Sequence, residues 1–143
     1  MRLLLLAVVA AASSMTGVAG AQEYSAYLGH WNGPFLFYVA QPDTGAQGSP
    51  QVFSGVLQIE HDGSLRGAVP DADCTLAGSS VDYITSANAS IDLVVSGCRD
   101  VRFNGHFTGK LISNPQLRYA SLRLSSLRSL EAGTAQISAI IRR

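Results

Sequence analysis

The chain has 143 residues, and its ten basic and ten acidic residues give a formal net charge of zero. This length is enough for one domain. No basic block points to a nucleic-acid partner, and no acidic tail points to a partner held by charge. Only 14% of the residues are charged, and glycine is frequent, which favours short strands and tight turns over helices.

The N-terminus has the three parts of a secretory signal peptide. Arg2 is the only early charge, Leu3–Ala12 holds only Leu, Ala and Val, and small residues lead to the cleavage sequence Ala19–Ala21. A membrane anchor would need about 20 apolar residues, and polar residues interrupt this run sooner. We therefore expect residues 1–21 to be removed, in a bacterium, by cleavage after Ala21. Residues 22–143 should then form a single β domain that is periplasmic or secreted, with no membrane span.

Two cysteines remain in the exported part, Cys74 and Cys98. In an oxidising compartment a cysteine pair is most simply a disulfide. A metal site would need further ligands at defined spacing, and the chain has no C-x-x-C sequence. We expect a disulfide whose loop of about 25 residues stabilises the fold by roughly 3 kcal/mol.

Apolar residues alternate with polar ones along the first part of this domain, which is typical of half-buried strands. Strands are predicted over Tyr27–Ala40 and Gln51–Glu60. The sequence His61-Asp62-Gly63 predicts a hairpin turn into a strand near Leu65–Val69, because Asp-Gly supports the positive φ values of such a turn. The inward residues would be Trp31, Phe35, Phe37 and Val39, then Phe53, Gly55, Leu57 and Ile59, then Leu65, Gly67 and Val69.

The middle of the chain predicts a short strand at Cys74–Ala77, a long connection over Gly78–Ala89 and a strand at Ser90–Gly97. A hairpin of these two strands would place the cysteines near its open end, at a spacing that a disulfide can bridge. Alternation over Val101–Ile112 predicts one more strand, with Val101 and Phe103 inward.

The last third of the chain leaves strand and helix open. Leu117–Leu124 alternates as a strand does, but its leucines and those that follow also fit a helical stripe. We favour a strand there, a turn or short helix at 126–132, and a final strand at 134–142.

About eight strands joined in sequence predict an all-β fold, an antiparallel up-and-down barrel, with a two-sheet β-sandwich as the alternative. Glycines inside the strands permit the sharp bends that a small closed barrel needs. An outer-membrane barrel would need an apolar outer band, whereas the strand predicted at 101–112 has a charged outer face.

The segment Leu28-Gly29-His30-Trp31-Asn32-Gly33 resembles the opening strand of the calycins, the group of lipocalins and avidins. In that family a Gly-x-Trp sequence begins the first strand of a secreted barrel. The resemblance, which covers these six residues and the strand count, implies that Trp31 closes one barrel end. It also implies that a late basic residue, Arg142 or Arg143, packs on the Trp31 ring.

Two similar segments place His30 and His106 after a glycine and before an aromatic residue. If their strands were close together, the two rings could hold a metal ion. We interpret both as histidines on polar outer faces, and His61 as a turn residue. We expect no metal, cofactor or catalytic residue. The chain has no G-x-S-x-G sequence, and the spacing of its aspartates singles out no catalytic pair.

A binding module is the function that we favour, for a protein partner in the manner of an inhibitor or for a small apolar ligand. The segment 41–50 is the loop that a barrel mouth would present. The alternatives are a metal-dependent or hydrolytic enzyme and a structural protein of the cell envelope. Whether the barrel is hollow or filled decides between an internal ligand and a surface partner.

Export gives the first testable prediction. Because Ala19–Ala21 has the form that signal peptidase cuts after, we expect the exported protein to begin at Gln22. Mass spectrometry of the intact exported protein measures this. Soluble exported material that still carries residues 1–21 would contradict it.

Overall fold

The computed structural model describes residues 27–44, 46, 48–82, 88–114 and 118–143, so the predicted signal peptide and Leu117 lie outside the described residues. Eight strands dominate these residues, and two single 3-10 turns, η2 (Pro70–Ala72) and η3 (Val101–Phe103), lie between strands. The strands are β1 (Gly29–Ala40), β2 (Gln51–Ile59), β3 (Ser64–Val69), β4 (Cys74–Asp82), β5 (Asn88–Ser96), β6 (Gly105–Asn114), β7 (Tyr119–Leu130) and β8 (Gly133–Arg142). No helix within the described residues is long and apolar enough to cross a membrane.

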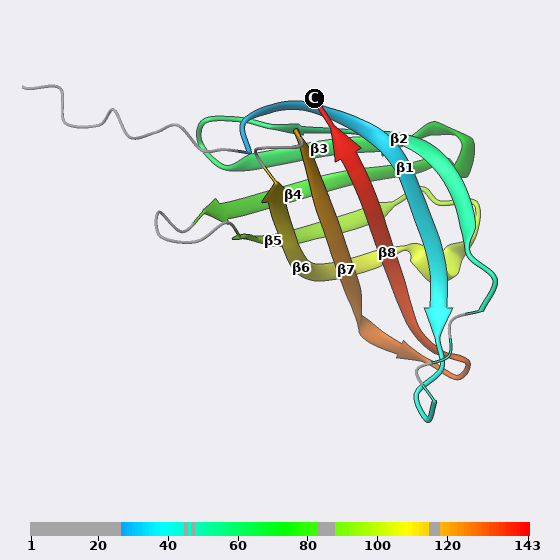
Figure 1. The fold of residues 1–143 in the computed structure, drawn as a ribbon. Coiled ribbons are helices and arrows are strands. Elements are labelled where there is room, and N and C mark those ends of the chain that lie inside the picture. Colours follow the sequence, from blue (N-terminus) through cyan, green and yellow to red (C-terminus); the bar gives the residue numbers. More distant parts are fainter. Residues whose placement is uncertain (1–26, 45, 47, 83–87, 115–117) are drawn as a thin grey trace, which may run out of the picture.

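The strands form one closed antiparallel barrel in which each strand pairs with its neighbours in sequence, and β8 pairs with β1 (Figure 1). Trp31 lies opposite Leu57 of β2, and Phe35 lies opposite both Phe53 of β2 and Ala139 of β8. The prediction of an all-β up-and-down barrel is therefore confirmed. The alternative of two separate sheets is wrong, because the β1–β8 pairing leaves no open edge.

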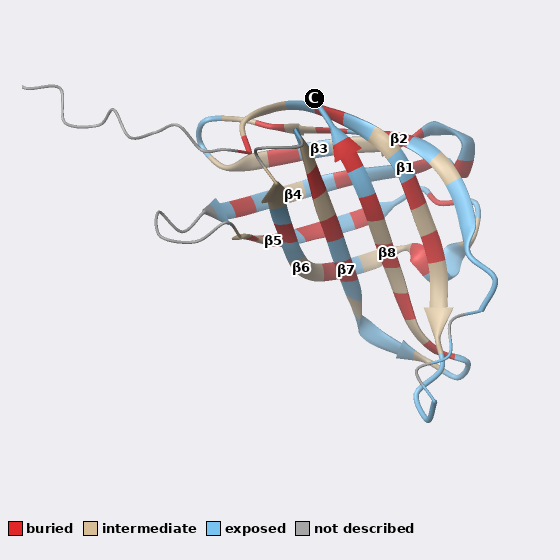
Figure 2. Ribbon diagram, viewed as in Figure 1, coloured by how far each residue is buried: buried red, intermediate tan, exposed pale blue. Residues whose placement is uncertain are grey.

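Buried and exposed residues alternate along most strands, as Figure 2 shows. This period of two places the apolar side chains inside the barrel and the polar side chains outside. The inward residues predicted for β1, β2 and β3 are largely confirmed. The largest side chains that are fully buried are Phe35, Leu57, Leu65, Val69, Leu76, Leu93, Phe107, Leu111, Leu122, Leu124, Ile137 and Ile141.

Large side chains fill the barrel interior. The ring of Phe35, which is 0% exposed, lies over Gly55, where an added Cβ atom would come within 2.5 Å of it. At Gly67 an added Cβ atom would meet the Val56 carbonyl oxygen at 2.7 Å and the side chains of Leu57 and Leu76. The interior glycines therefore make room for neighbouring apolar groups, and the interior is packed as a core.

Three sequence predictions are corrected. The predicted strand Val101–Ile112 begins only at Gly105, because Asp100 caps a 3-10 turn, and Val101 is 69% exposed instead of inward. In the predicted connection Gly78–Ala89 the described residues are strand, since β4 continues to Asp82 in register with β5, and residues 83–87 lie outside the described part of the chain. The predicted turn or short helix at 126–132 is mostly strand: β7 runs to Leu130, and an irregularity between Ser125 and Ser129 breaks the alternation.

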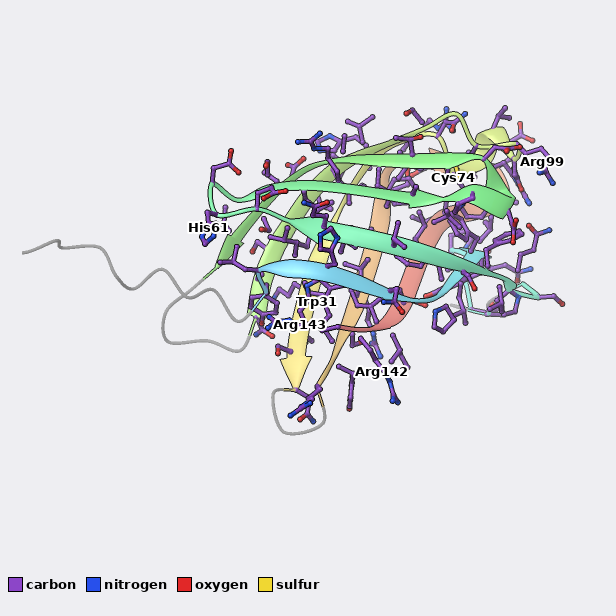
Figure 3. The ribbon with its side chains drawn as sticks, turned by 90° about the horizontal axis from the view of Figure 1, so that it is seen from above. Trp31, His61, Cys74, Arg99, Arg142 and Arg143 are labelled. Carbon is purple, nitrogen blue, oxygen red and sulfur yellow. A yellow bond between two sulfur atoms is a disulfide. The ribbon has the colours of Figure 1, made fainter. Side chains whose placement is uncertain are left out.

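One end of the barrel is closed by Trp31. Its side chain is 3% exposed, and its indole Nε1–H donates to the carbonyl oxygen of Tyr27 at 2.8 Å. The guanidinium carbon of Arg143 lies 4.6 Å from the ring centroid, a cation–π contact. The Tyr27 hydroxyl accepts a hydrogen bond from the Ser113 backbone N–H, which ties the segment before β1 to β6. Figure 3 shows Trp31 and Arg143 together at this closed end.

Trp31 should be the most costly single truncation at this end. We expect Trp31→Ala to lower the free energy of unfolding by about 3–5 kcal/mol, because it leaves a large cavity. Arg143→Ala should cost about 0.5–1 kcal/mol, the value of one cation–π contact. Denaturant unfolding measures both, with Val94→Ala on the outer face of β5 as a control that should change stability by less than about 0.5 kcal/mol. A loss below about 1 kcal/mol for Trp31→Ala would contradict the closed end described above.

Candidate binding site

Four connections between strands gather at the barrel end opposite Trp31, which we call the open end. They are the links β1–β2, β3–β4, β5–β6 and β7–β8, because neighbouring strands alternate in direction. The link β3–β4 contains η2, and the link β5–β6 contains η3. Figure 3 shows Cys74 and Arg99 at this end, far from Trp31 and Arg143. The open end is therefore built from turns, whereas the wall is built from strands.

A half-open pocket of about 280 Å³ lies at the open end. Strands β1 and β2 supply one side of it, and the two 3-10 turns with the residues next to them supply the other. The lining residues, which define the open-end pocket, are Phe37, Gln51, Phe53, Asp71, Ala72, Cys74, Cys98, Arg99, Asp100 and Phe103. Aromatic and disulfide groups thus meet charged groups in one depression.

Three phenylalanines form the apolar wall of the open-end pocket. The ring centroid of Phe37 lies 5.7 Å from that of Phe53 and 5.1 Å from that of Phe103. The ring planes meet at 74° and 87°, which is the edge-to-face arrangement that aromatic quadrupoles favour. Phe37 and Phe103 are buried, and Phe53 is partly exposed. The packing holds the three rings at fixed angles to one another.

The Cys74–Cys98 disulfide forms part of the pocket wall and confirms the predicted pairing. Its Cα atoms are 4.2 Å apart, since Cys74 begins β4 and Cys98 follows β5. It joins η2 to the segment that leads into η3. The predicted hairpin of these two strands is confirmed as well.

Arg99 holds the same two segments together through its backbone and its side chain. Its N–H donates to the Ala72 carbonyl at 3.0 Å, and its guanidinium donates to the Asp71 carbonyl at 3.2 Å. The guanidinium also pairs with the Asp73 carboxylate at 3.1 Å. Both of these side chains are more than half exposed, so the ion pair itself contributes little free energy. The contacts fix where the guanidinium lies at the pocket rim.

Asp100 shapes η3. Its carboxylate accepts from the Arg102 backbone N–H at 3.1 Å and pairs with the Arg102 guanidinium at 2.7 Å. The side-chain hydrogen bond from Arg102 lowers the pKa of Asp100 below its ordinary value of 3.8. Arg128, which lies within the irregularity in β7, donates to the carbonyls of Val101 and Asn104 at 3.4 Å. These contacts position Phe103 against the barrel.

The histidines lie outside the open-end pocket. His30 is exposed on β1, and His61 is exposed in the turn after β2. His106 on β6 lies 2.5 Å from an Asp92 carboxylate oxygen on β5, an exposed pair. Strands β7 and β8 separate β6 from β1, so the barrel does not bring His30 and His106 together. Among the described residues no group of three His, Cys, Asp or Glu side chains could hold a metal ion.

Comparisons with protein-family models, with curated protein sequences and with solved structures find no match to this chain. The sequence reasoning identified the two cysteines but missed the pocket that they line. Phe103 was assigned to a strand, and Arg99 and Asp71 were not singled out. One feature of the sequence could have indicated the turn. Asp100 precedes Val101 and Arg102, and an aspartate at this position can cap a short turn ahead of a buried aromatic residue.

Removing the disulfide should destabilise the whole barrel. We expect Cys74→Ala with Cys98→Ala to lower the free energy of unfolding by roughly 3 kcal/mol, because the unfolded chain loses its cross-link. Denaturant unfolding measures the loss, and thiol labelling of unfolded, unreduced wild-type protein should find no free thiol. Two free thiols would contradict the disulfide itself. Unchanged stability in the double variant would contradict its role in stabilising the barrel.

Acid should weaken the η3 cap. The pKa of Asp100 is lower in the folded protein than in the unfolded chain, so its contribution is present above pH 4 or so and is lost as the pH falls through the folded pKa. We expect Asp100→Ala to cost about 1 kcal/mol at pH 7 and less near pH 2. Unfolding measured at both values tests this, and an equal cost at both would contradict it. Asp43→Ala in the exposed loop is the control.

Proposed function

We propose that this protein is an exported binding module that recognises another protein through the open-end pocket. One observation carries the proposal: a pocket of about 280 Å³ with an aromatic wall is held by a disulfide and an arginine clamp at one end of a packed barrel. A preformed pocket lowers the entropy cost of binding. The clamp therefore favours recognition without rearrangement of the open end.

The size of the pocket favours a side chain of a partner protein over a free ligand. Drug-sized ligands occupy pockets of roughly 300–1,000 Å³ that bury most of their surface. At about 280 Å³ this half-open pocket lies at the lower edge of that range and can receive about one large side chain. The interior is packed around Phe35 and Phe107, both 0% exposed, which argues against an internal ligand of the kind that hollow barrels carry.

The loop between β1 and β2 extends the same face. Backbone hydrogen bonds from Gln41 to Ala46 and from Gly48 to Val39 hold it next to the strand ends. The described loop residues are exposed, and Gln51 at the start of β2 lines the pocket. A partner seated on the pocket would therefore meet this loop, and we propose it as the second contact.

We also propose that the protein is exported and calycin-like. The disulfide supports export to the periplasm or the medium. The closed eight-strand barrel and the Arg143–Trp31 contact support a calycin-like protein, because that resemblance implies a late basic residue on the opening tryptophan. Binding is favoured over catalysis because the three histidines lie away from the pocket.

Site-specific photo-crosslinking in the organism that makes the protein tests this proposal. We expect a photoreactive residue at Gln51, on the pocket rim, to give an adduct of one discrete mass with an exported protein. The same residue at Val94, an exposed position on the wall of β5, is the matched control and should give none. Phe53→Ala should reduce the Gln51 adduct at least about fivefold, as expected when an interface contact worth about 1 kcal/mol is lost.

Equal adducts at Gln51 and Val94, or a Gln51 adduct unchanged by Phe53→Ala, would contradict the pocket as the binding site. Native mass spectrometry of the purified protein covers the other source of a ligand. If a small molecule is bound stoichiometrically to the wild-type protein and is lost in Phe53→Ala, the pocket binds a free ligand instead of a partner protein.

A further inference from the structure

We infer that the group entering the open-end pocket is an organic cation with an apolar stem, the chemistry of a lysine or arginine side chain. The inference rests on the proposed function and names the chemistry that this pocket selects. It combines the aromatic wall with the charges that line the rim.

The charges at the rim leave one carboxylate unmatched. Arg99 is paired with Asp73, and Asp100 is paired with Arg102. Asp71 lines the pocket as well, and only its backbone carbonyl is used, by Arg99. Within the described part of the chain, the Asp71 carboxylate makes no ion pair or hydrogen bond. The pocket therefore offers one free negative charge at its rim.

The aromatic wall favours the same class of group. The faces of aromatic rings attract organic cations, and Phe53 is the partly exposed ring of this wall. Phe53 and Phe103 both stand nearly perpendicular to Phe37. The guanidinium carbon of Arg102, which does not line the pocket, lies 5.8 Å from the centroid of the Phe103 ring, so one ring of this wall already contacts a cation from another side.

Other classes of group fit less well. A neutral side chain would cover the Asp71 carboxylate without giving it a partner, and a desolvated charge without a partner is costly. An anion would meet Asp71 and Asp100, while the guanidinium of Arg99 is already held by Asp73. A lysine or arginine places its aliphatic stem on the rings and its charge at the carboxylate.

Probes that differ only in charge test the inference. Nα-acetyl-lysine amide and Nα-acetyl-norleucine amide share a four-carbon aliphatic stem. Only the lysine probe carries an ammonium group, at the end of that stem. Backbone amide shifts of the wild-type protein are followed by NMR as each probe is added. We expect both probes to shift residues around the pocket and lysine to bind about fivefold more tightly or better. Salt should reduce the difference.

Asp71→Asn separates charge from shape. It should abolish the preference for lysine and leave norleucine binding unchanged. Glu131→Gln, at an exposed glutamate in the β7–β8 turn that does not line the pocket, is the matched control and should keep the preference. Tetramethylammonium is the third probe: stronger binding than lysine would identify a free cation as the source instead of a partner's side chain.

Three results would overturn the inference. Norleucine binding as tightly as lysine would show a pocket that selects apolar groups, and the proposed function would stand. A lysine preference that persists in Asp71→Asn would remove the role of that carboxylate. No shift at the pocket with any probe at about 10 mM, roughly tenfold above a dissociation constant of 1 mM, would reject the cation. In that case the crosslink at Gln51 decides separately whether a partner binds there.

Discussion

The pairing of the first strand with the last is the constraint on which the rest of this structure depends. Seven of the strand pairings join strands that are consecutive in the chain. The eighth joins β1 to β8, which come from opposite ends of the described sequence, and closes the barrel. Closure gives every strand two neighbours, so the backbone hydrogen bonds of the wall are satisfied within the sheet. It also encloses one face of the sheet, and this enclosed face is the core.

Closure also forces the two ends of the barrel to be finished by other means. At one end Trp31 covers the core, Tyr27 accepts its hydrogen bond, and Arg143 lies on the ring. At the other end two 3-10 turns, a disulfide and Arg99 perform the same task less completely. The remaining depression is the open-end pocket. The two ends therefore differ in chemistry as well as in shape, which is why only one of them is a candidate for recognition.

The sequence predicted the wall of the barrel better than its ends. Alternation is a strong signal in β1, β5 and β8, because burial inside the barrel selects apolar residues at every second position. The same rule failed at Val101–Phe103, where three alternating residues form a 3-10 turn capped by Asp100. Local hydrogen bonds of a capping aspartate outweigh a short alternating pattern.

The pocket was out of reach of sequence reasoning for a related reason. Its residues come from four separate segments, and their meeting depends on the disulfide and on the contacts of Arg99. The cysteine pairing could be predicted because only one pair exists. The angle between Phe37 and Phe103 could not, since it follows from packing of elements whose order in space was unknown.

The location of the pocket in the turns bears on how this protein could diversify. Substitutions in the wall must respect register and close packing: at Gly109 an added Cβ atom would lie 1.8 Å from the Arg123 carbonyl oxygen. Substitutions at Gln51 or Asp71 alter exposed side chains and leave the ladders between strands intact. A lineage of such barrels could therefore exchange one target for another by changing a handful of rim positions, while the scaffold inherited by every member stays the same.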